Sequence, residues 1–214
     1  RMYFSEENAI KIDGMRIDIE DLYRRKKINE SEYMYLLASL IESIMGVSNT
    51  TGTYEAYLKH WDNRALKPFQ ITPLEINHVE LRSENVIYNN DSNHIIRELS
   101  GDILYVDPPY TVTDYSSAYH LLETIAKYDY PDIKGITGRR IAPNTKSKYT
   151  RKNQALINFE DLIRQANFKH VVISYSTQGL IPIEELMDML RKFAVNGEVT
   201  LHSFPYREYK NIRS

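Results

Sequence analysis

The stretch DILYVDPPY, residues 102–110, is the most informative part of this 214-residue sequence about the fold. It begins as an apolar run of the length of a strand, and two prolines follow Asp107 directly. Because proline has no N–H and cannot continue a central strand, the strand must end near Asp107. In open α/β sheets, ligands bind outside the carboxyl ends of the strands. The stretch therefore predicts a buried strand with a candidate ligand site at its end.

Strand and helix patterns alternate around this stretch. The expected strands are residues 85–90, 102–107, 170–176 and 198–204. The expected helices are residues 92–99, 154–166 and 182–194. Such alternation is typical of βαβ units and predicts an α/β fold, with a largely parallel sheet that is covered on both faces. Between these elements, residues 132–150 form the longest predicted loop.

The beginning of the chain carries two helical patterns. Residues 5–27 have a plausible N-cap at Ser5, and apolar residues recur on one face of the expected helix. Residues 29–46 begin with Asn29 and Glu32, which have capping-box spacing, and continue with a stronger apolar stripe. Both segments are therefore predicted to be helices.

A polar turn and a shorter helix bearing Trp61 are predicted within residues 47–67, ending before Pro68. The composition changes near Pro73, where the strand patterns begin. We therefore predict a helical region over residues 1–72 and an α/β region over residues 73–214.

Composition excludes several classes of protein. The sequence has no cysteine, which rules out a disulfide framework and any thiolate metal site and is compatible with a reducing cytosol. No apolar run is long enough to span a membrane. A net charge of −2 gives no overall argument for nucleic-acid binding.

Basic residues are concentrated locally in residues 139–152. This segment contains no acid and six cations: Arg139, Arg140, Lys146, Lys148, Arg151 and Lys152. Such blocks are usually solvated loops, and the alternative is a loop that contacts phosphates.

The four residues Asp107, Pro108, Pro109 and Tyr110 together suggest a binding chemistry. Asp107 offers a carboxylate acceptor, and Pro109 restricts the backbone of Pro108 so that its carbonyl points in a fixed direction. Tyr110 supplies a flat face. Two acceptors beside a stacking surface suit a planar base that carries an exocyclic NH₂ group.

DPPY after a hydrophobic strand resembles the catalytic motif of amino-methyltransferases that act on adenine N6 or cytosine N4 in DNA. Three further stretches, RMYFSEENAIKIDGMR, VSNTTGTYEAYLKHW and DYSSAYHLLETIAKYDYPDIKGITGRR, resemble the Dam-like (α-group) N6-adenine DNA methyltransferases of restriction-modification systems. The likeness continues through VVISYSTQGL to FPYREY and so covers most of the chain.

This resemblance implies part of a Rossmann-like methyltransferase sheet with a helical insertion. It implies transfer of a methyl group from S-adenosylmethionine to N6 of an adenine that is swung out of duplex DNA. Asp107 and the Pro108 carbonyl would each accept a hydrogen bond from the N6 amine, and Tyr110 would stack on the base. Pro109 belongs to the same catalytic motif, and no metal is implied.

For the cofactor, the resemblance points to Asp91, Asp107 and Tyr115. Asp91 follows a predicted strand next to the catalytic one. An N-cap of the helix that starts at Ser92 is an equally good interpretation of Asp91, and both roles are compatible.

For DNA, the resemblance places the target-recognition region upstream of the catalytic strand, within residues 1–72. The candidate contacts are Lys59, Arg64, Arg139 and Arg140, and a solvated basic face is the alternative for each. The implied partner is double-stranded DNA, with a cognate restriction endonuclease in the same system but no direct contact to it. The expected location is the cytoplasm of a bacterial or phage-infected cell, without membrane association.

The family's Gly-rich cofactor turn is not found. No two of the eight glycines have G-x-G spacing, so we expect a methyltransferase that lacks its N-terminal portion. Three hypotheses remain open: an N6-adenine methyltransferase, a non-catalytic DNA-binding fragment of one, and an N4-cytosine methyltransferase.

Overall fold

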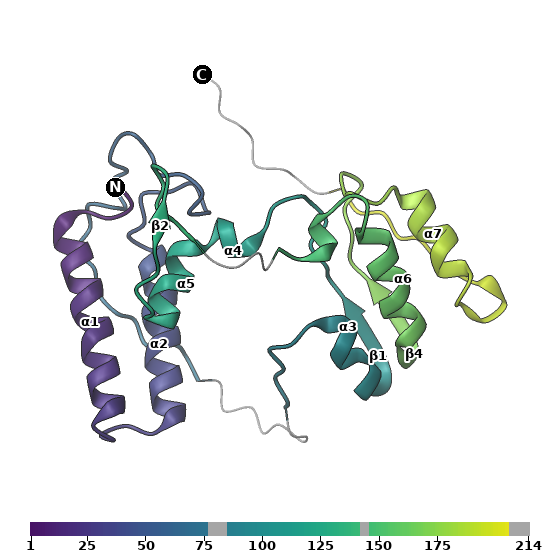
Figure 1. The fold of residues 1–214 in the computed structure, drawn as a ribbon, viewed down its shortest axis with the longest axis horizontal. Coiled ribbons are helices and arrows are strands. Elements are labelled where there is room, and N and C mark those ends of the chain that lie inside the picture. Colours follow the sequence, from purple (N-terminus) through teal and green to yellow (C-terminus); the bar gives the residue numbers. More distant parts are fainter. Residues whose placement is uncertain (77–84, 142–145, 206–214) are drawn as a thin grey trace. The chain divides into compact units, whose positions relative to one another are not determined.

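The computed structural model describes residues 1–76, 85–141 and 146–205 (Figure 1). Contacts between residues divide the chain into two compact units, each with a hydrophobic core of its own. Unit 1 comprises Arg1–Ile87 and Thr113–Lys146, and unit 2 comprises Tyr88–Val112 and Ser147–Ser214. Each unit is described by itself below.

Unit 1 is mainly helical, and Figure 1 shows its two long helices, α1 and α2, side by side. Its elements are α1 (Glu6–Arg24), α2 (Glu30–Met45), α4 (Tyr115–Ala118), α5 (His120–Lys127) and the antiparallel hairpin β2 (Ile133–Lys134) and β3 (Arg139–Arg140). The two predicted N-termini are confirmed. The Ser5 side chain accepts from the Asn8 N–H, and Asn29 and Glu32 form a reciprocal capping box.

The core of unit 1 lies between α1 and α2. It is formed by Ile12 and Ile19 from α1, Leu40 and Ile44 from α2, and Phe69 from the chain that follows. The four residues from α1 and α2 lie on the apolar helix faces that the sequence periodicity predicted.

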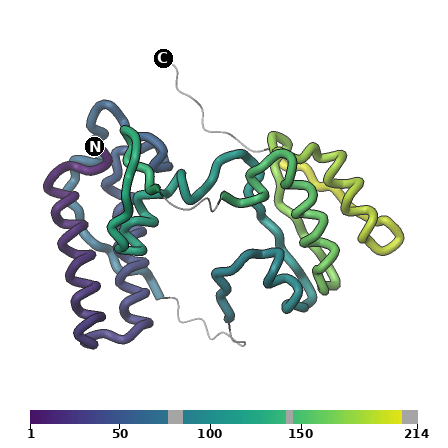
Figure 2. Tube along the Cα trace, viewed as in Figure 1, coloured from purple at the N-terminus to yellow at the C-terminus, as the bar shows by residue number. Residues whose placement is uncertain are grey.

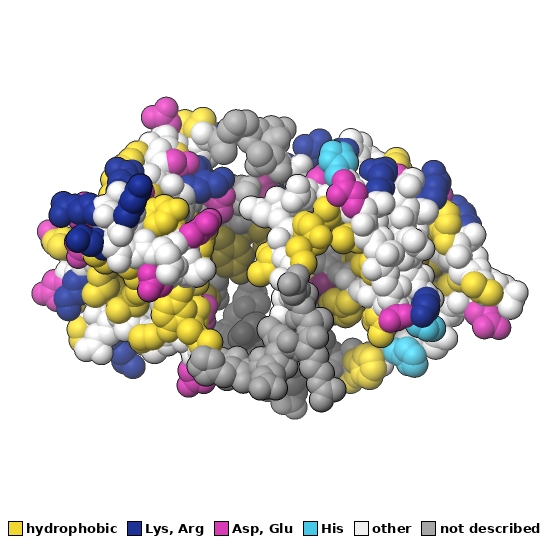
Figure 3. Space-filling view, turned by 90° about the horizontal axis from the view of Figure 1, so that it is seen from below, with side chains coloured by type: hydrophobic (Ala, Val, Ile, Leu, Met, Phe, Trp, Pro, Cys, Tyr) yellow, Lys and Arg dark blue, Asp and Glu magenta, His cyan; other side chains and the backbone are white. Residues whose placement is uncertain are grey.

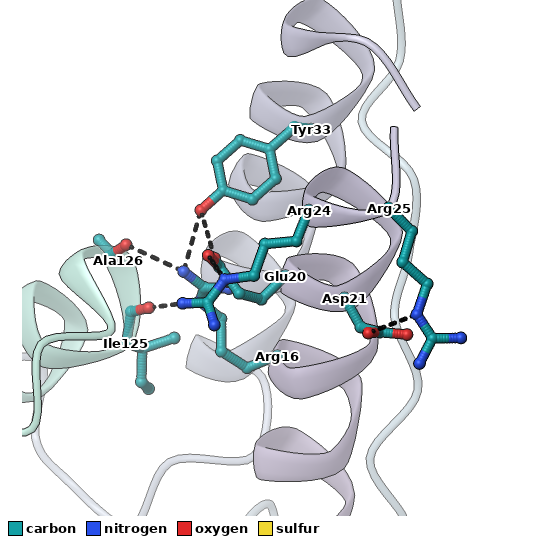
Figure 4. A network of polar contacts seen from close by, with 8 residues as sticks. All are labelled: Arg16, Glu20, Asp21, Arg24, Arg25, Tyr33, Ile125 and Ala126. Carbon is teal, nitrogen blue, oxygen red and sulfur yellow. Dashed lines mark hydrogen bonds and ion pairs between the residues drawn. The ribbon is translucent and has the colours of Figure 1, made fainter. Parts of the chain in front are cut away.

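A buried arginine joins α1 to the end of α5 (Figure 4). Arg16 donates from Nε to the Ile125 carbonyl at 2.7 Å, and from its terminal nitrogens to Glu20 and the Tyr33 hydroxyl at 3.0 Å each. Its guanidinium also lies 4.4 Å from the centre of the Tyr128 ring. A charge is stable in this interior position because carboxylate, carbonyls and an aromatic face replace its water.

The helix predicted within residues 47–67 is wrong, since the chain there follows an irregular path (Figure 2). Polar side chains hold this path in place of helical hydrogen bonds. The buried Asn49 donates to the Met2 and Leu58 carbonyls and accepts from the Asp62 N–H. Asn, Ser and Thr side chains can form hydrogen bonds with backbone groups in place of helical ones, and the segment begins with several of these residues.

Unit 2 combines short helices with a two-stranded parallel sheet. Its elements are α3 (Ser92–Ile95), η1 (Ile96–Glu98), β1 (Ser100–Val106), η2 (Lys148–Thr150), α6 (Ala155–Gln165), β4 (Asn167–Ile173), α7 (Ile183–Arg191) and η3 (Val195–Gly197). The strand register runs from Ser100 opposite Asn167 to Val106 opposite Ile173. The α/β class with a parallel pairing is thus confirmed.

The core of unit 2 is formed where α6 and α7 pack near the end of β1. Val106 belongs to it together with Phe159 and Leu162 of α6 and Leu186 and Met189 of α7. Helix α3 and the turn η1 add Ile96 to the same core.

The expectation of a sheet covered on both faces is wrong for the described part of the chain. Ile103 and Tyr105, two apart on β1, are 64% and 62% exposed, and Val172 opposite Tyr105 is 49% exposed. Figure 3 shows hydrophobic side chains exposed over both units. One face of this parallel pair is therefore open to solvent, which parallel sheets usually avoid.

The strands predicted at residues 85–90 and 198–204 do not form. Their apolar residues suit a strand, but a strand also needs a neighbour to satisfy its backbone groups. In the described residues neither segment has such a neighbour, and Ile87 is almost fully exposed. The predicted loop at residues 132–150, in turn, contains the β2–β3 hairpin and η2.

Candidate functional site

The motif that begins at Asp107 leaves the carboxyl end of β1 and is held at both ends by the chain after β4. The Ser174 N–H donates to the Val106 carbonyl at 2.9 Å, which extends the parallel ladder up to the motif. The Leu180 N–H donates to the Tyr110 carbonyl at 2.8 Å. Between these two points the Asp107 side chain is exposed, and Pro108 and Pro109 are half-buried.

The ring of Tyr110 lies against a second tyrosine that the sequence analysis missed. The Tyr110 and Tyr175 ring centres are 6.3 Å apart with the planes at 74°, an edge-to-face contact. Tyr175 itself rests on Phe159 of α6, and its hydroxyl accepts from the Ile181 N–H at 3.1 Å. Burial raises the pKa of Tyr175, so this phenol stays protonated at neutral pH.

Gly179 is required by the same packing. A Cβ at this position would lie 2.3 Å from the Tyr175 ring, so any side chain would displace that ring. The signal in the sequence was an aromatic residue directly after a strand, followed at short distance by a glycine, in SYSTQGL. We infer that Tyr175 and Gly179 position Tyr110.

Asp91 caps helix α3, as one of its two interpretations predicted. Its Oδ1 accepts from the Asn93 N–H at 2.9 Å. The Asn93 amide in turn donates to Asp161 at 2.8 Å and accepts from the Tyr149 hydroxyl at 2.7 Å. Burial raises the pKa of Tyr149 to about 12, so it remains a donor. This network joins the start of α3, which Asp91 caps, to α6. The cofactor role of Asp91 stays a prediction.

Tyr115 is placed in unit 1, whereas Asp91 and the motif from Asp107 to Tyr110 belong to unit 2. It starts helix α4, is exposed, and has its ring 6.2 Å from that of Tyr119. The cofactor-binding role of Tyr115 therefore stays a prediction.

Two of the four candidate DNA contacts have protein partners that explain their position. Arg64 donates to the Ser48 and Thr50 carbonyls at 2.9 and 2.7 Å. The Arg140 side chain is only 10% exposed and pairs with Asp129, whose pKa it lowers through its hydrogen bonds. Both arginines hold unit 1 together, and their role in DNA binding stays a prediction.

The other two candidates are more accessible. Lys59 is exposed in the irregular segment of residues 47–69. Arg139 is paired with Glu55 at 3.4 Å, and both side chains are more than 40% exposed. Because exposed pairs at this distance contribute little to stability, Arg139 can exchange Glu55 for another anion.

No predicted site residue lines the apolar cavity of about 280 Å³ in unit 1. That cavity lies between α1 and α5 and is lined by Phe4, Ile12, Asp13, Ile125 and Tyr128, among others. Within residues 1–76, 85–141 and 146–205, no group of three or more metal-ligating side chains comes together. No helix in this part of the chain is long and apolar enough to cross a membrane.

Comparison with known proteins identifies the family. Residues 1–189 match the family described as D12 class N6 adenine-specific DNA methyltransferase. The chain belongs to this family. The resemblance to N6-adenine DNA methyltransferases, inferred from DPPY and the surrounding stretches, is thereby confirmed.

Similar curated proteins are modification enzymes. The chain is 52% identical over its whole length to modification methylase LlaI of Lactococcus lactis subsp. lactis, covering 34% of that protein. It is 46% identical over 99% of its length to type II methyltransferase M.FokI of Planomicrobium okeanokoites, covering 32%, and 40% identical over 98% to M.NlaIII of Neisseria lactamica, covering 61%. This D12-family chain thus spans about a third of the length of the first two relatives. No solved structure gives a significant match.

Proposed function

We propose that this D12-family chain is the base-holding part of an enzyme that methylates N6 of adenine in duplex DNA, within a restriction-modification system. The observation that carries the proposal is the position of the motif. Asp107, Pro108 and Tyr110 follow the carboxyl end of a parallel strand and are fixed by the Ser174 and Leu180 backbone N–H groups. This strand end is where α/β sheets bind ligands.

The motif's own residues explain how an amine is made nucleophilic. The Asp107 carboxylate and the Pro108 carbonyl each accept one N–H of a flipped-out adenine amine. These contacts favour a pyramidal nitrogen, whose lone pair is then available as the transition state is approached. Tyr110, held edge-on by Tyr175, stacks on the base and fixes its orientation for attack.

S-adenosylmethionine, the methyl donor that the family implies, supplies the methyl group. The side chains that fit it are carboxylates: Asp107 is exposed at the strand end, and Asp91 presents a second carboxylate at the N-terminus of α3. Carboxylates suit the cofactor's hydroxyl, amino and sulfonium groups. The sequence has no G-x-G turn, which would let the backbone approach the methionine portion of the cofactor. We therefore propose the carboxylates of Asp91 and Asp107 as contacts of this chain to the cofactor.

We infer further that β1 and β4 belong to a larger, Rossmann-like sheet. Their open face carries Ile103, Tyr105 and Val172. Full burial of a Val, Leu, Ile or Phe side chain stabilises the folded state by roughly 1.5–3 kcal/mol. Further strands and a covering helix would remove this exposed surface, and the first two relatives are about three times as long as this chain.

DNA contact is proposed for unit 1, with residues 1–72 forming the target-recognition region. Lys59 and Arg139, the accessible candidates, would meet phosphates, and the cognate endonuclease need not touch the chain. A system of this kind acts on DNA in the cytoplasm of a bacterial or phage-infected cell.

The test is methyl transfer from radiolabelled S-adenosylmethionine to unmethylated bacterial DNA. It compares this chain with a version extended by the in-frame codons upstream of Arg1. We expect the extended protein to transfer label to N6-methyladenine, and Asp107→Ala, which removes the acceptor, to reduce the rate by roughly 10²–10³-fold, by analogy with a lost oxyanion-hole donor. Glu123→Ala, which removes a partly exposed carboxylate on α5, is the matched control and should leave the rate unchanged.

The same assay separates the alternatives. Label in N4-methylcytosine after digestion to nucleosides shows that the base is cytosine. DNA binding without transfer by the extended protein supports a non-catalytic fragment. If the extended protein transfers label and Asp107→Ala does so at the wild-type rate, the proposed role of the motif is wrong.

A further inference from the structure

The turn between β2 and β3 carries one hydrophobic side chain at its tip, and Ile133 and Ile141 at the base of the hairpin are 48% and 55% exposed. The turn residues are Gly135, Ile136, Thr137 and Gly138, and Ile136 is 81% exposed. Both glycines have φ of +72°, which favours glycine and fixes a tight turn. The apolar group is therefore presented on a short, defined turn.

The hairpin is anchored at its base. Arg140 of β3 pairs with Asp129 and donates to the Thr124 hydroxyl of α5 at 3.1 Å. The Ile141 N–H donates to the Asp132 carbonyl at 2.7 Å and closes the hairpin. The tip thus extends from a fixed support.

Cations surround the tip. Arg1 donates from its side chain to the Ile136 and Gly135 carbonyls at 3.0 and 3.3 Å, and these hydrogen bonds hold the turn. Lys134 and Arg139 face each other as a register pair immediately before and after the turn. Arg139 has the exposed Glu55 as its weak partner.

An exposed isoleucine between cations fits one kind of partner better than others. A protein partner usually requires a broad apolar patch, whereas Ile136 is the single apolar side chain of the turn Gly135–Gly138, and Ile133 and Ile141 at the hairpin base are only about half exposed. Duplex DNA offers phosphates for the cations and a base-pair step into which a single Leu, Ile, Met or Phe can wedge. Extruding a base requires such local unstacking.

We propose that the β2–β3 turn inserts Ile136 between base pairs while Arg1, Lys134 and Arg139 contact the flanking phosphates. This inference rests on the proposed function, and it identifies the turn as the element that opens the stack. It draws on unit 1 alone, independently of Asp107 and the motif.

Unwinding of DNA tests the wedge directly. Relaxed closed-circular plasmid is treated with topoisomerase I in the presence of the 214-residue chain, and topoisomers are resolved after the protein is removed. An inserted side chain unwinds the duplex and leaves a change in linking number. We expect the wild-type chain to shift the topoisomer distribution, and Ile136→Ala to lose more than half of this shift at equal occupancy. Ile10→Ala, which truncates a 66% exposed isoleucine on α1, should keep it.

The phosphate contacts are tested by salt dependence on a fluorescent 30-base-pair duplex of mixed sequence. Lys134→Gln and Arg139→Gln should each reduce the slope of log K against log salt by about 1, while Lys11→Gln, an exposed lysine on α1, should not change it. Circular dichroism checks that each variant is folded.

Contrary results are distinguishable from failure of the proposed function. The inference is overturned if the wild-type chain does not bind or does not unwind the plasmid, or if Ile136→Ala unwinds it equally. If unwinding depends on Ile136 and the extended protein transfers no methyl group, the inference stands and the proposed function fails. If transfer depends on Asp107 and unwinding does not depend on Ile136, the inference alone fails.

Discussion

Replacing Arg16 by methionine should destabilise unit 1 more than any loss of a surface charge. Methionine keeps most of the apolar stem and removes the guanidinium. Glu20, Tyr33 and the Ile125 carbonyl then lose a donor that lies within 2.7–3.0 Å of each in the wild type.

The magnitude follows from burial. The side chains of Arg16 and Glu20 are 3% and 17% exposed, so water screens their pairing only weakly. Removing one partner of such a pair costs about 3–5 kcal/mol. With a urea m-value of about 2 kcal/mol/M, the midpoint of unfolding should fall by ~2 M.

Urea unfolding followed by Trp61 fluorescence measures this change, because the only tryptophan of the sequence lies in the same unit. Arg24→Met is the matched control. Arg24 pairs with the same Glu20, but its side chain is 70% exposed, so the expected loss is below about 1 kcal/mol. Equal midpoints for the two variants would refute the reasoning.

The pH dependence gives a second measurement of the Arg16 network. Burial alone raises the pKa of Glu20, yet the hydrogen bonds from Arg16, Tyr33 and Arg24 outweigh it and leave the pKa lowered. A lowered folded-state pKa contributes stability that is present above the unfolded value of about 4.3 and is lost as the pH falls through the folded value. The wild type should therefore lose stability below about pH 4 more steeply than Arg16→Met.

Three further outcomes are expected. Gly138→Ala should destabilise the folded chain by about 1–2 kcal/mol in thermal unfolding, because φ is +72° and a Cβ would lie 2.7 Å from the Arg1 side chain. Gly14→Ala within α1 is the contrast, since its Cβ meets no neighbour within 4 Å, and it should stabilise the chain by about 1 kcal/mol. Gly179→Ala should displace Tyr175 and reduce methyl transfer by the extended protein while leaving the Tm of unit 1 unchanged; equal transfer rates would show that Tyr175 does not position Tyr110. Burial lowers the pKa of His120 in the folded chain. The stability due to its neutral form is therefore present above about pH 6.5 and is lost as the pH falls towards the folded-state pKa. Between pH 7.5 and 5 the Tm of His120→Gln should fall less than that of the wild type.

The elements that the sequence predicted well are those whose signal is local. The capping box of Asn29 and Glu32 and the periodic apolar residues of α1 and α2 act within one helix, so their outcome depends on few other residues. The end of β1 was also local, because proline after Asp107 excludes a longer strand.

The errors concern segments whose outcome depends on distant partners. Residues 47–69 carry helix-forming residues around Trp61, but Asn49 and Arg64 satisfy backbone groups of this segment through their side chains. The contact of Tyr175 with Tyr110 was missed as well, because it joins two strand ends that are far apart in sequence. Such tertiary contacts override local propensity.

The open sheet face bears on the strength of the amine-binding site that we propose at Asp107. Asp107 is exposed at the end of a strand whose Ile103 and Tyr105 also face solvent. An acceptor in water gains little from a hydrogen bond to an amine, because water competes for both groups, whereas the same acceptor in a site that excludes water stabilises developing charge by several kcal/mol. Covering the open face would therefore do two things at once, since it would bury apolar side chains and strengthen the hydrogen bond to an amine that we propose for Asp107. An extension of the chain that restores methyl transfer should consequently also protect Ile103 and Tyr105 from solvent, and transfer without that protection would mean that the sheet is not completed at this face.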